Sequence, residues 1–141
     1  MKLRRPHTVS SSTPAWPFRA FLTRPHDGDS FFVLADLGFS TRFEAELRLF
    51  GVRAPEIHPM QTGGQETLDF INGWFAGVAK DGQRRWPLYV EVVATTTYEP
   101  QMDMSFTRYV ATVWDYDDRS TSLNAAVNTF LSGHPEWPTG D

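Results

Sequence analysis

Four ionisable side chains interrupt apolar segments of the sequence. Arg48 lies near the end of a stretch of alternating residues that becomes increasingly apolar, and Arg108 opens the apolar stretch "RYVATVW". Asp29 follows a turn, and Glu56 follows Pro55, whose fixed φ angle orients the chain after it. One or two carboxylates with two arginines form a minimal set for hydrolysing a phosphate ester. The carboxylates hold a cation or orient water, and the guanidinium groups neutralise charge that develops on the phosphoryl oxygens.

Each of these residues also has a purely structural interpretation. The two aspartates of "HDGDS" could serve only to shape a turn, and Glu56 alone would be an exposed loop acid. Arg48 could pair across strands with Glu46 or Glu91. The chemistry therefore depends on whether these residues lie together in the fold.

Alternation of apolar and polar residues predicts five β-strands. They are expected over residues 17–23, 30–36, 41–52, 86–96 and 108–115. The dipeptide Asp27-Gly28 is a strong signal for a hairpin turn between the first two strands.

Helical periodicity predicts two helices. The first should follow the loop 53–64, with Thr62 and Gln65 at the spacing of a capping box. Its apolar stripe is expected to comprise Leu68, Ile71, Trp74, Phe75 and Val78. The second, "STSLNAAVNTFLSG", should begin at a serine cap, Ser120 or Ser122, and end at Gly133. This order of elements predicts an α+β, mainly β fold, a five-stranded OB-fold barrel with two packed helices.

Composition limits the class of protein. A chain of 141 residues fits one domain, expected over residues 16–137, with a disordered basic segment at 1–15 and a tail at 138–141. The absence of cysteine excludes disulfides and cysteine-based zinc sites. No apolar run approaches the ~20 residues of a membrane helix. The basic start lacks the apolar middle of a signal peptide, so a cytoplasmic protein without a membrane partner is expected.

Charge is distributed unevenly along the chain. The net charge is −4, yet residues 1–26 carry five Lys or Arg and no acid, which leaves the remainder strongly acidic. Such a body does not attract nucleic acid by its general field. Any binding to phosphate must therefore come from a few well-placed arginines or from the basic segment.

Four motifs occur in a recognisable order: "HDGDSFFV", "LRLFGVRAPE", "FTRYVATVWDYDD" and "LNAAVNTFLSGH". Together they resemble the successive motifs of the staphylococcal nuclease (thermonuclease-like) family, over residues 17–137. The segment "DLGF" resembles the corresponding segment of phage-encoded members of that family. The resemblance implies a calcium-dependent nuclease on an OB barrel that cleaves DNA and RNA with little sequence preference and leaves 3′-phosphate ends.

The resemblance also implies roles for individual residues. Asp29 matches the first metal-binding aspartate, Asp27 matches the acid two residues before it, and Ala54 would offer its backbone carbonyl to the metal. Arg48 and Arg108 match the two arginines that bind phosphate.

Glu56 matches the glutamate that acts on the attacking water. Trp137 could match an aromatic residue that stacks near the bound nucleotide, and Phe106 would also contact substrate. Most members carry a lysine and a tyrosine shortly before the second arginine, where this chain has Ser105 and Phe106, so part of the contact with the nucleotide differs.

Arg53 departs from the family pattern, because it occupies the position of the second metal-binding aspartate. A guanidinium group is always protonated and has no lone pair to ligate a metal. If Arg53 faced Asp29, the pair would be worth ~4 kcal/mol at ~4 Å and an effective dielectric constant near 20, before desolvation.

Three arrangements are consistent with this departure. Arg53 could face solvent while Asp27, Asp29 and Glu56 still hold a cation. Arg53 could instead replace the metal as a fixed cation. Alternatively the chain is an inactive OB-fold module that binds nucleic acid or protein. Retention of the two arginines and the glutamate favours the nuclease, because a discarded site would be expected to lose a buried arginine early.

Overall fold

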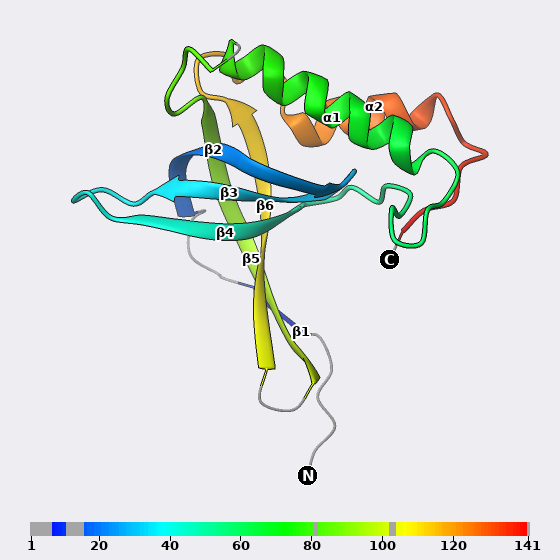
Figure 1. Ribbon diagram of the computed structural model, residues 1–141, viewed down its shortest axis with the longest axis horizontal. Coiled ribbons are helices and arrows are strands. Elements are labelled where there is room, and N and C mark those ends of the chain that lie inside the picture. Colours follow the sequence, from blue (N-terminus) through cyan, green and yellow to red (C-terminus); the bar gives the residue numbers. More distant parts are fainter. Residues whose placement is uncertain (1–6, 11–15, 81, 102–103, 141) are drawn as a thin grey trace.

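Five strands close into a barrel in the computed structural model, which describes residues 7–10, 16–80, 82–101 and 104–140 (Figure 1). The strands of the barrel are β2 (Trp16–Asp27), β3 (Ser30–Asp36), β4 (Arg42–Leu49), β5 (Leu88–Gln101) and β6 (Met104–Asp115). They are hydrogen-bonded in the order β5-β2-β3-β4-β6, and antiparallel pairing of β5 with β6 closes the barrel. The β4–β6 pair is parallel and all other pairs are antiparallel. The expected OB-type barrel is confirmed.

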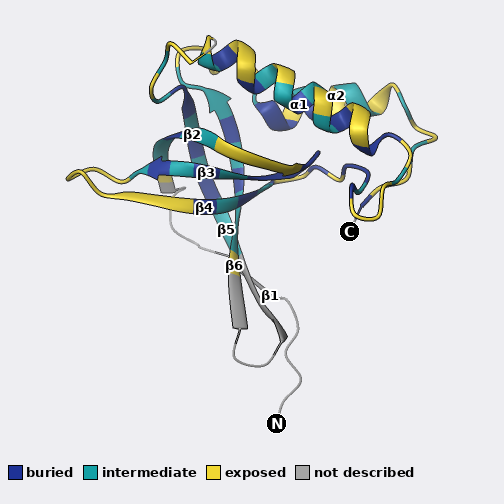
Figure 2. Ribbon diagram, viewed as in Figure 1, coloured by how far each residue is buried: buried dark blue, intermediate teal, exposed yellow. Residues whose placement is uncertain are grey.

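Alternate residues of each strand fill the barrel. On β4 the side chains of Ala45, Leu47 and Leu49 are buried, whereas Glu46 and Arg48 are only partly covered (Figure 2). Arg48 therefore lies on the outer face of the barrel and does not point into the apolar interior, because successive side chains of a strand alternate between its two faces. The partly exposed position leaves its guanidinium group accessible from solvent.

Two helices, α1 (Gly64–Ala79) and α2 (Leu123–Ser132), lie together over one end of the barrel (Figure 1). Phe70 of α1 stacks on Phe130 of α2, with ring centroids 4.6 Å apart. The buried face of α1 includes Ile71, Phe75 and Val78 from the predicted stripe. Within the described residues, no helix is both long and apolar enough to cross a membrane.

The helix ends agree with the sequence at α2 and differ at α1. Ser122 caps α2 by accepting a hydrogen bond from the N–H of Ala125, and Gly133 ends the helix, as expected. The predicted capping box of α1 is wrong. The residue before α1 is Gly63, in a left-handed conformation without a side-chain cap, and Gln65 instead donates to Asp69.

Strand β1 (His7–Ser10) lies within the segment that was expected to be disordered. It pairs antiparallel with β5, in the register His7↔Thr97. The other residues of that segment, and residue 141 of the expected tail, lie outside the described part of the chain.

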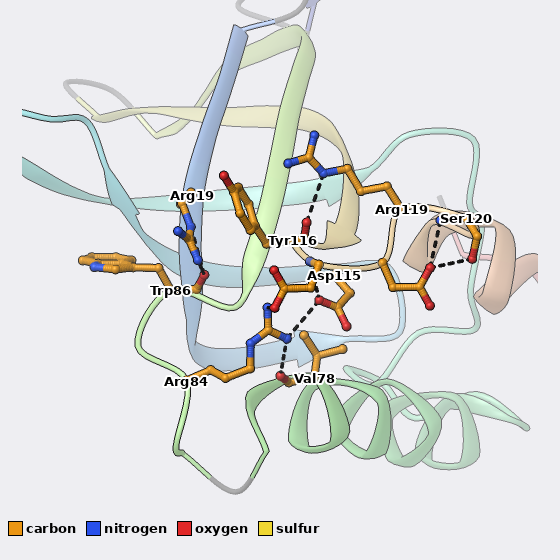
Figure 3. Close-up of polar contacts among 10 residues, drawn as sticks. Arg19, Val78, Arg84, Trp86, Asp115, Tyr116, Arg119 and Ser120 are labelled. Carbon is orange, nitrogen blue, oxygen red and sulfur yellow. Dashed lines mark hydrogen bonds and ion pairs between the residues drawn. The ribbon is translucent and has the colours of Figure 1, made fainter.

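The loop after α1 is fixed to the barrel by arginine contacts (Figure 3). Arg84 donates to the carbonyl of Val78 and to Asp115, both at 2.9 Å, and its second terminal nitrogen lies 2.8 Å from Asp117. Nearby, Arg19 donates to the carbonyl of Trp86. These contacts hold the end of α1 against the end of β6.

Candidate functional site

The turn between β2 and β3 is built around a buried carboxylate. Asp27 Oδ1 accepts hydrogen bonds from the N–H of Asp29 at 3.1 Å and from Ser30 Oγ at 2.8 Å. Gly28 between them is pressed against α1, since an added Cβ would lie 2.5 Å from Thr67 Cγ2 and 2.8 Å from Ala54 Cβ. Close packing therefore requires glycine here and places the turn beside the loop that precedes α1.

Asp29 joins three elements of the fold. Its side chain is 2% exposed, and Oδ2 accepts a hydrogen bond from the N–H of Ala54 at 3.1 Å. Arg48 Nη2 on β4 lies 3.7 Å from the same oxygen. The strand register explains this contact, because Ser30 pairs with Arg48 and so brings the arginine next to Asp29.

Burial and proximity separate the pKa values of the two aspartates. Burial raises the pKa of Asp29 to about 7, with further increases from its hydrogen bond to Asp27 and from the charge of Asp27. For Asp27 burial also acts to raise the pKa, but hydrogen bonds from Asp29 and Ser30 outweigh it, so the pKa of Asp27 is lowered. The pair therefore retains one proton up to near-neutral pH, held mainly on Asp29.

Arg48 and Arg108 lie on the same outer face of the barrel. In the parallel β4–β6 pair, Leu47 is in register with Tyr109 and Arg48 with Val110. By the same register Arg108 lies beside Glu46. It is therefore one pleat, or two residues along the strand, away from the level of Arg48. Arg108 Nε lies 3.0 Å from Glu46 Oε2. The structure therefore brings the two predicted arginines together, and the cross-strand partner of Glu46 is Arg108 rather than Arg48.

Arg53 does not contact Asp29. Its side chain is exposed, and it forms no ion pair within the part of the chain that the structure describes. Arg53 thus faces solvent, as the first of the three arrangements requires, and it does not stand beside Asp29 in place of a metal, as the second requires. The cation beside the buried carboxylate is Arg48.

Glu56 lies two residues beyond Ala54 in a loop closed by its own hydrogen bonds. The N–H of Glu56 donates to Gln61 Oε1 at 2.7 Å, and the N–H of Gln61 donates back to the carbonyl of Glu56 at 2.9 Å. Gly140 lies against this loop, and its N–H donates to the carbonyl of Ala54 at 2.8 Å. A Cβ added at Gly140 would overlap Glu56 Oε2 and would lie 2.5 Å from the Ala54 carbonyl oxygen.

Trp137 packs within the protein. Its indole stacks on His134, with ring centroids 3.8 Å apart and planes 3° from parallel, and lies near Phe130 of α2. An added Cβ at Gly63 would overlap the indole. The tryptophan is therefore seated on the residue that precedes α1. Phe106 belongs to β6, and its side chain lies outside the described residues.

The residues present do not fit a calcium ion of the kind that the family resemblance implies. Arg53 offers no lone pair, the carbonyl of Ala54 already accepts from Gly140, and Asp29 Oδ2 is held by a backbone N–H and by Arg48. The described residues contain no group of three or more His, Asp or Glu placed to hold a metal ion.

A chain of contacts nevertheless joins the predicted site residues in one region. Arg48 contacts Asp29, Asp29 contacts Ala54, and Gly140 contacts both Ala54 and Glu56. Sequence reasoning missed Gly140, and no local signal could have identified it, because its partners lie more than 80 residues away in the sequence. Comparisons with protein-family models, with curated proteins and with solved structures found no match for this chain.

Proposed function

We propose that the chain hydrolyses phosphodiester bonds of DNA or RNA. The observation that carries the proposal is the pair Arg48 and Arg108, one pleat apart on one face of the barrel and next to the turn that holds Asp29. Two guanidinium groups at adjacent pleats suit the oxygens of a phosphodiester, because each offers forked N–H donors with a fixed positive charge. Glu56 supplies the carboxylate for the attacking water.

The carboxylate partners of the arginines do not prevent phosphate from binding. Arg108 and Glu46 have side chains 25% and 15% exposed, and Arg48 is 23% exposed. Both arginines are therefore only partly covered, and charge-assisted hydrogen bonds to phosphate oxygens can replace those to a carboxylate. A phosphodiester can therefore replace Glu46 at Arg108 and share Arg48 with Asp29.

The proposed reaction uses side chains of this protein, a water molecule and a proton from solvent. A water held by Glu56 attacks phosphorus, the P–O5′ bond breaks, and the 5′-oxygen leaves with a proton from solvent. Glu56 takes the proton of the attacking water, and the two arginines neutralise the charge that develops on the phosphoryl oxygens. Base contacts play no part in these steps, so little sequence preference is expected.

The test is cleavage of a fluorescent single-stranded oligonucleotide in calcium, in magnesium and in chelator. Arg48→Ala, Arg108→Ala and Glu56→Gln should each lower the rate about 100-fold or more, the usual effect of removing a group that stabilises the transition state. Arg119→Ala is the matched control, because this exposed arginine lies over Tyr89 and Tyr116 and away from the site. If each of the three variants cleaved the oligonucleotide at the wild-type rate, the proposal would be ruled out.

A second candidate function is an OB-fold module that binds nucleic acid or protein without cleaving it. It is favoured by the engagement of each charged group, since Arg48 and Arg108 have carboxylate partners and Gly140 lies on Glu56. Binding of the oligonucleotide without cleavage, in all three conditions, would support the module and reject the hydrolase.

A further inference from the structure

We infer that residues 134–140, here called the strap, close the candidate site and must lift before a phosphodiester reaches Glu56. This inference rests on the proposed function in taking a phosphodiester as the ligand of the site. The strap follows α2 and returns alongside the loop that precedes α1 (Figure 1). It is attached to that loop at two points, Gly140 and Trp137.

The first attachment covers the groups that the reaction needs. Gly140 is buried, its N–H donates to the carbonyl of Ala54, and its Cα side faces the carboxylate of Glu56 so closely that no Cβ fits. A water that attacks phosphorus from Glu56 Oε2 would need the space that Gly140 fills. Gly140 therefore covers Glu56 Oε2 and the carbonyl of Ala54 while this attachment holds.

The second attachment is the contact between the indole of Trp137 and Gly63. Gly63 has a φ angle of 88°, a left-handed conformation that favours glycine, and the indole lies where any side chain at this position would stand. His134 stacks on the indole with ring centroids 3.8 Å apart, and the His134 ring also lies 5.4 Å from that of Phe130 on α2. The tryptophan thus fixes the strap to the loop before α1.

Apart from its two attachments the strap has little holding it to the barrel. Pro135, Glu136, Pro138 and Thr139 are all exposed. A segment with few buried contacts opens locally at a small fraction of the cost of global unfolding. The strap can therefore lift while the barrel and both helices stay folded.

A ligand that binds only the open state has its apparent affinity reduced by the fraction of molecules that are open. Weakening either attachment should therefore tighten binding. Gly140→Ala introduces a Cβ that overlaps the Glu56 carboxylate, and Trp137→Ala removes the ring seated on Gly63. The matched control is Thr139→Ala, an exposed strap residue.

The experiment measures binding of the oligonucleotide dT12 in chelator, together with amide hydrogen exchange at position 140 by NMR. Gly140→Ala and Trp137→Ala should speed the exchange and tighten dT12 binding about fivefold or more, the factor that corresponds to one net hydrogen bond. Thr139→Ala should change neither quantity. Exchange at core amides of β3 and β6 reports whether each variant keeps its fold.

The sign of the Trp137→Ala effect separates the strap from a direct contact with substrate. A tryptophan that stacks on a nucleotide would weaken binding when removed, whereas a strap residue strengthens it. Faster exchange at position 140 with unchanged or weaker dT12 binding in both variants would overturn the inference. Tighter binding without cleavage in the two variants would support the strap and reject the hydrolase instead.

Discussion

Arg48, and not Arg53, provides the positive charge beside the buried Asp29 carboxylate, with Nη2 3.7 Å from Oδ2. Arg53 is exposed and takes no part in this ion pair. Because arginine has no oxygen atom in its side chain, Arg53 adds no ligand for a metal ion near Asp29. The charge beside Asp29 is therefore supplied by a side chain of the protein itself.

Asp29→Asn should flatten the dependence of stability on pH. The pKa of Asp29 is raised to about 7 in the folded state, so the folded protein binds more protons than the unfolded chain between about pH 4 and 7. Its contribution to stability is complete below pH 4 and is lost as pH rises through 7. From pH 4 to pH 8 the stability of wild type relative to the variant should fall by at most about 4 kcal/mol, and by less to the extent that the opposite shift in the pKa of Asp27 offsets it.

Urea denaturation from pH 4 to pH 8 tests this prediction. Asp69→Asn, which alters an exposed acid on α1, should follow the wild-type profile. An Asp29→Asn profile as steep as that of wild type would mean that the Asp27–Asp29 pair does not carry the extra proton.

Asn124→Ala should destabilise the protein by about 3 kcal/mol, because it leaves buried polar groups without partners. Asn124 is 6% exposed; its amide donates to the carbonyls of Phe50 and Ala111, and its Oδ1 accepts from the N–H of Val113. Asn128→Ala removes one exposed hydrogen bond to Gly51 and should cost under about 1 kcal/mol. Thermal and urea denaturation measure both, and equal losses in the two variants would contradict the assignment.

Arg84→Ala should cost about 2 kcal/mol, whereas Arg85→Ala should stay within about 0.5 kcal/mol of wild type. Arg84 has a side chain only 15% exposed and binds Val78, Asp115 and Asp117 (Figure 3). Arg85 is exposed. Chemical denaturation at low and at 0.5 M salt checks the pair of variants. If the two arginines proved equivalent, the bonds drawn from Arg84 would not be stabilising the end of α1.

Local patterns in the sequence were sufficient to predict most of the elements. Alternation gave the bounds 30–36 of β3 as the structure has them, and the serine and glycine signals gave both ends of α2. The capping box failed because tertiary contacts decide the start of α1. Gly63 adopts a left-handed conformation and Trp137 covers it, a contact between residues 74 positions apart that no local rule contains.

The candidate residues could be named from the sequence, but their pairings could not. Arg48, Arg108 and Asp29 were identified by their positions in apolar segments, but the partner of each arginine depends on strand register. A shift of one residue would move every side chain to the other face of its strand. The pairs Arg48–Asp29 and Arg108–Glu46 therefore required the three-dimensional structure.

Arg53→Asp alone should not create a calcium site that binds tightly, although it places a carboxylate in the loop beyond Asp29. Calcium takes six to eight oxygen ligands, and the carbonyl of Ala54 remains bound to the N–H of Gly140 in this variant. The double variant Arg53→Asp with Gly140→Ala frees that carbonyl and should bind calcium at least about tenfold more tightly than Arg53→Asp. Calorimetry at pH 8, where Asp29 is ionised, measures the difference. Equal affinities would show that the strap does not compete with a metal for Ala54.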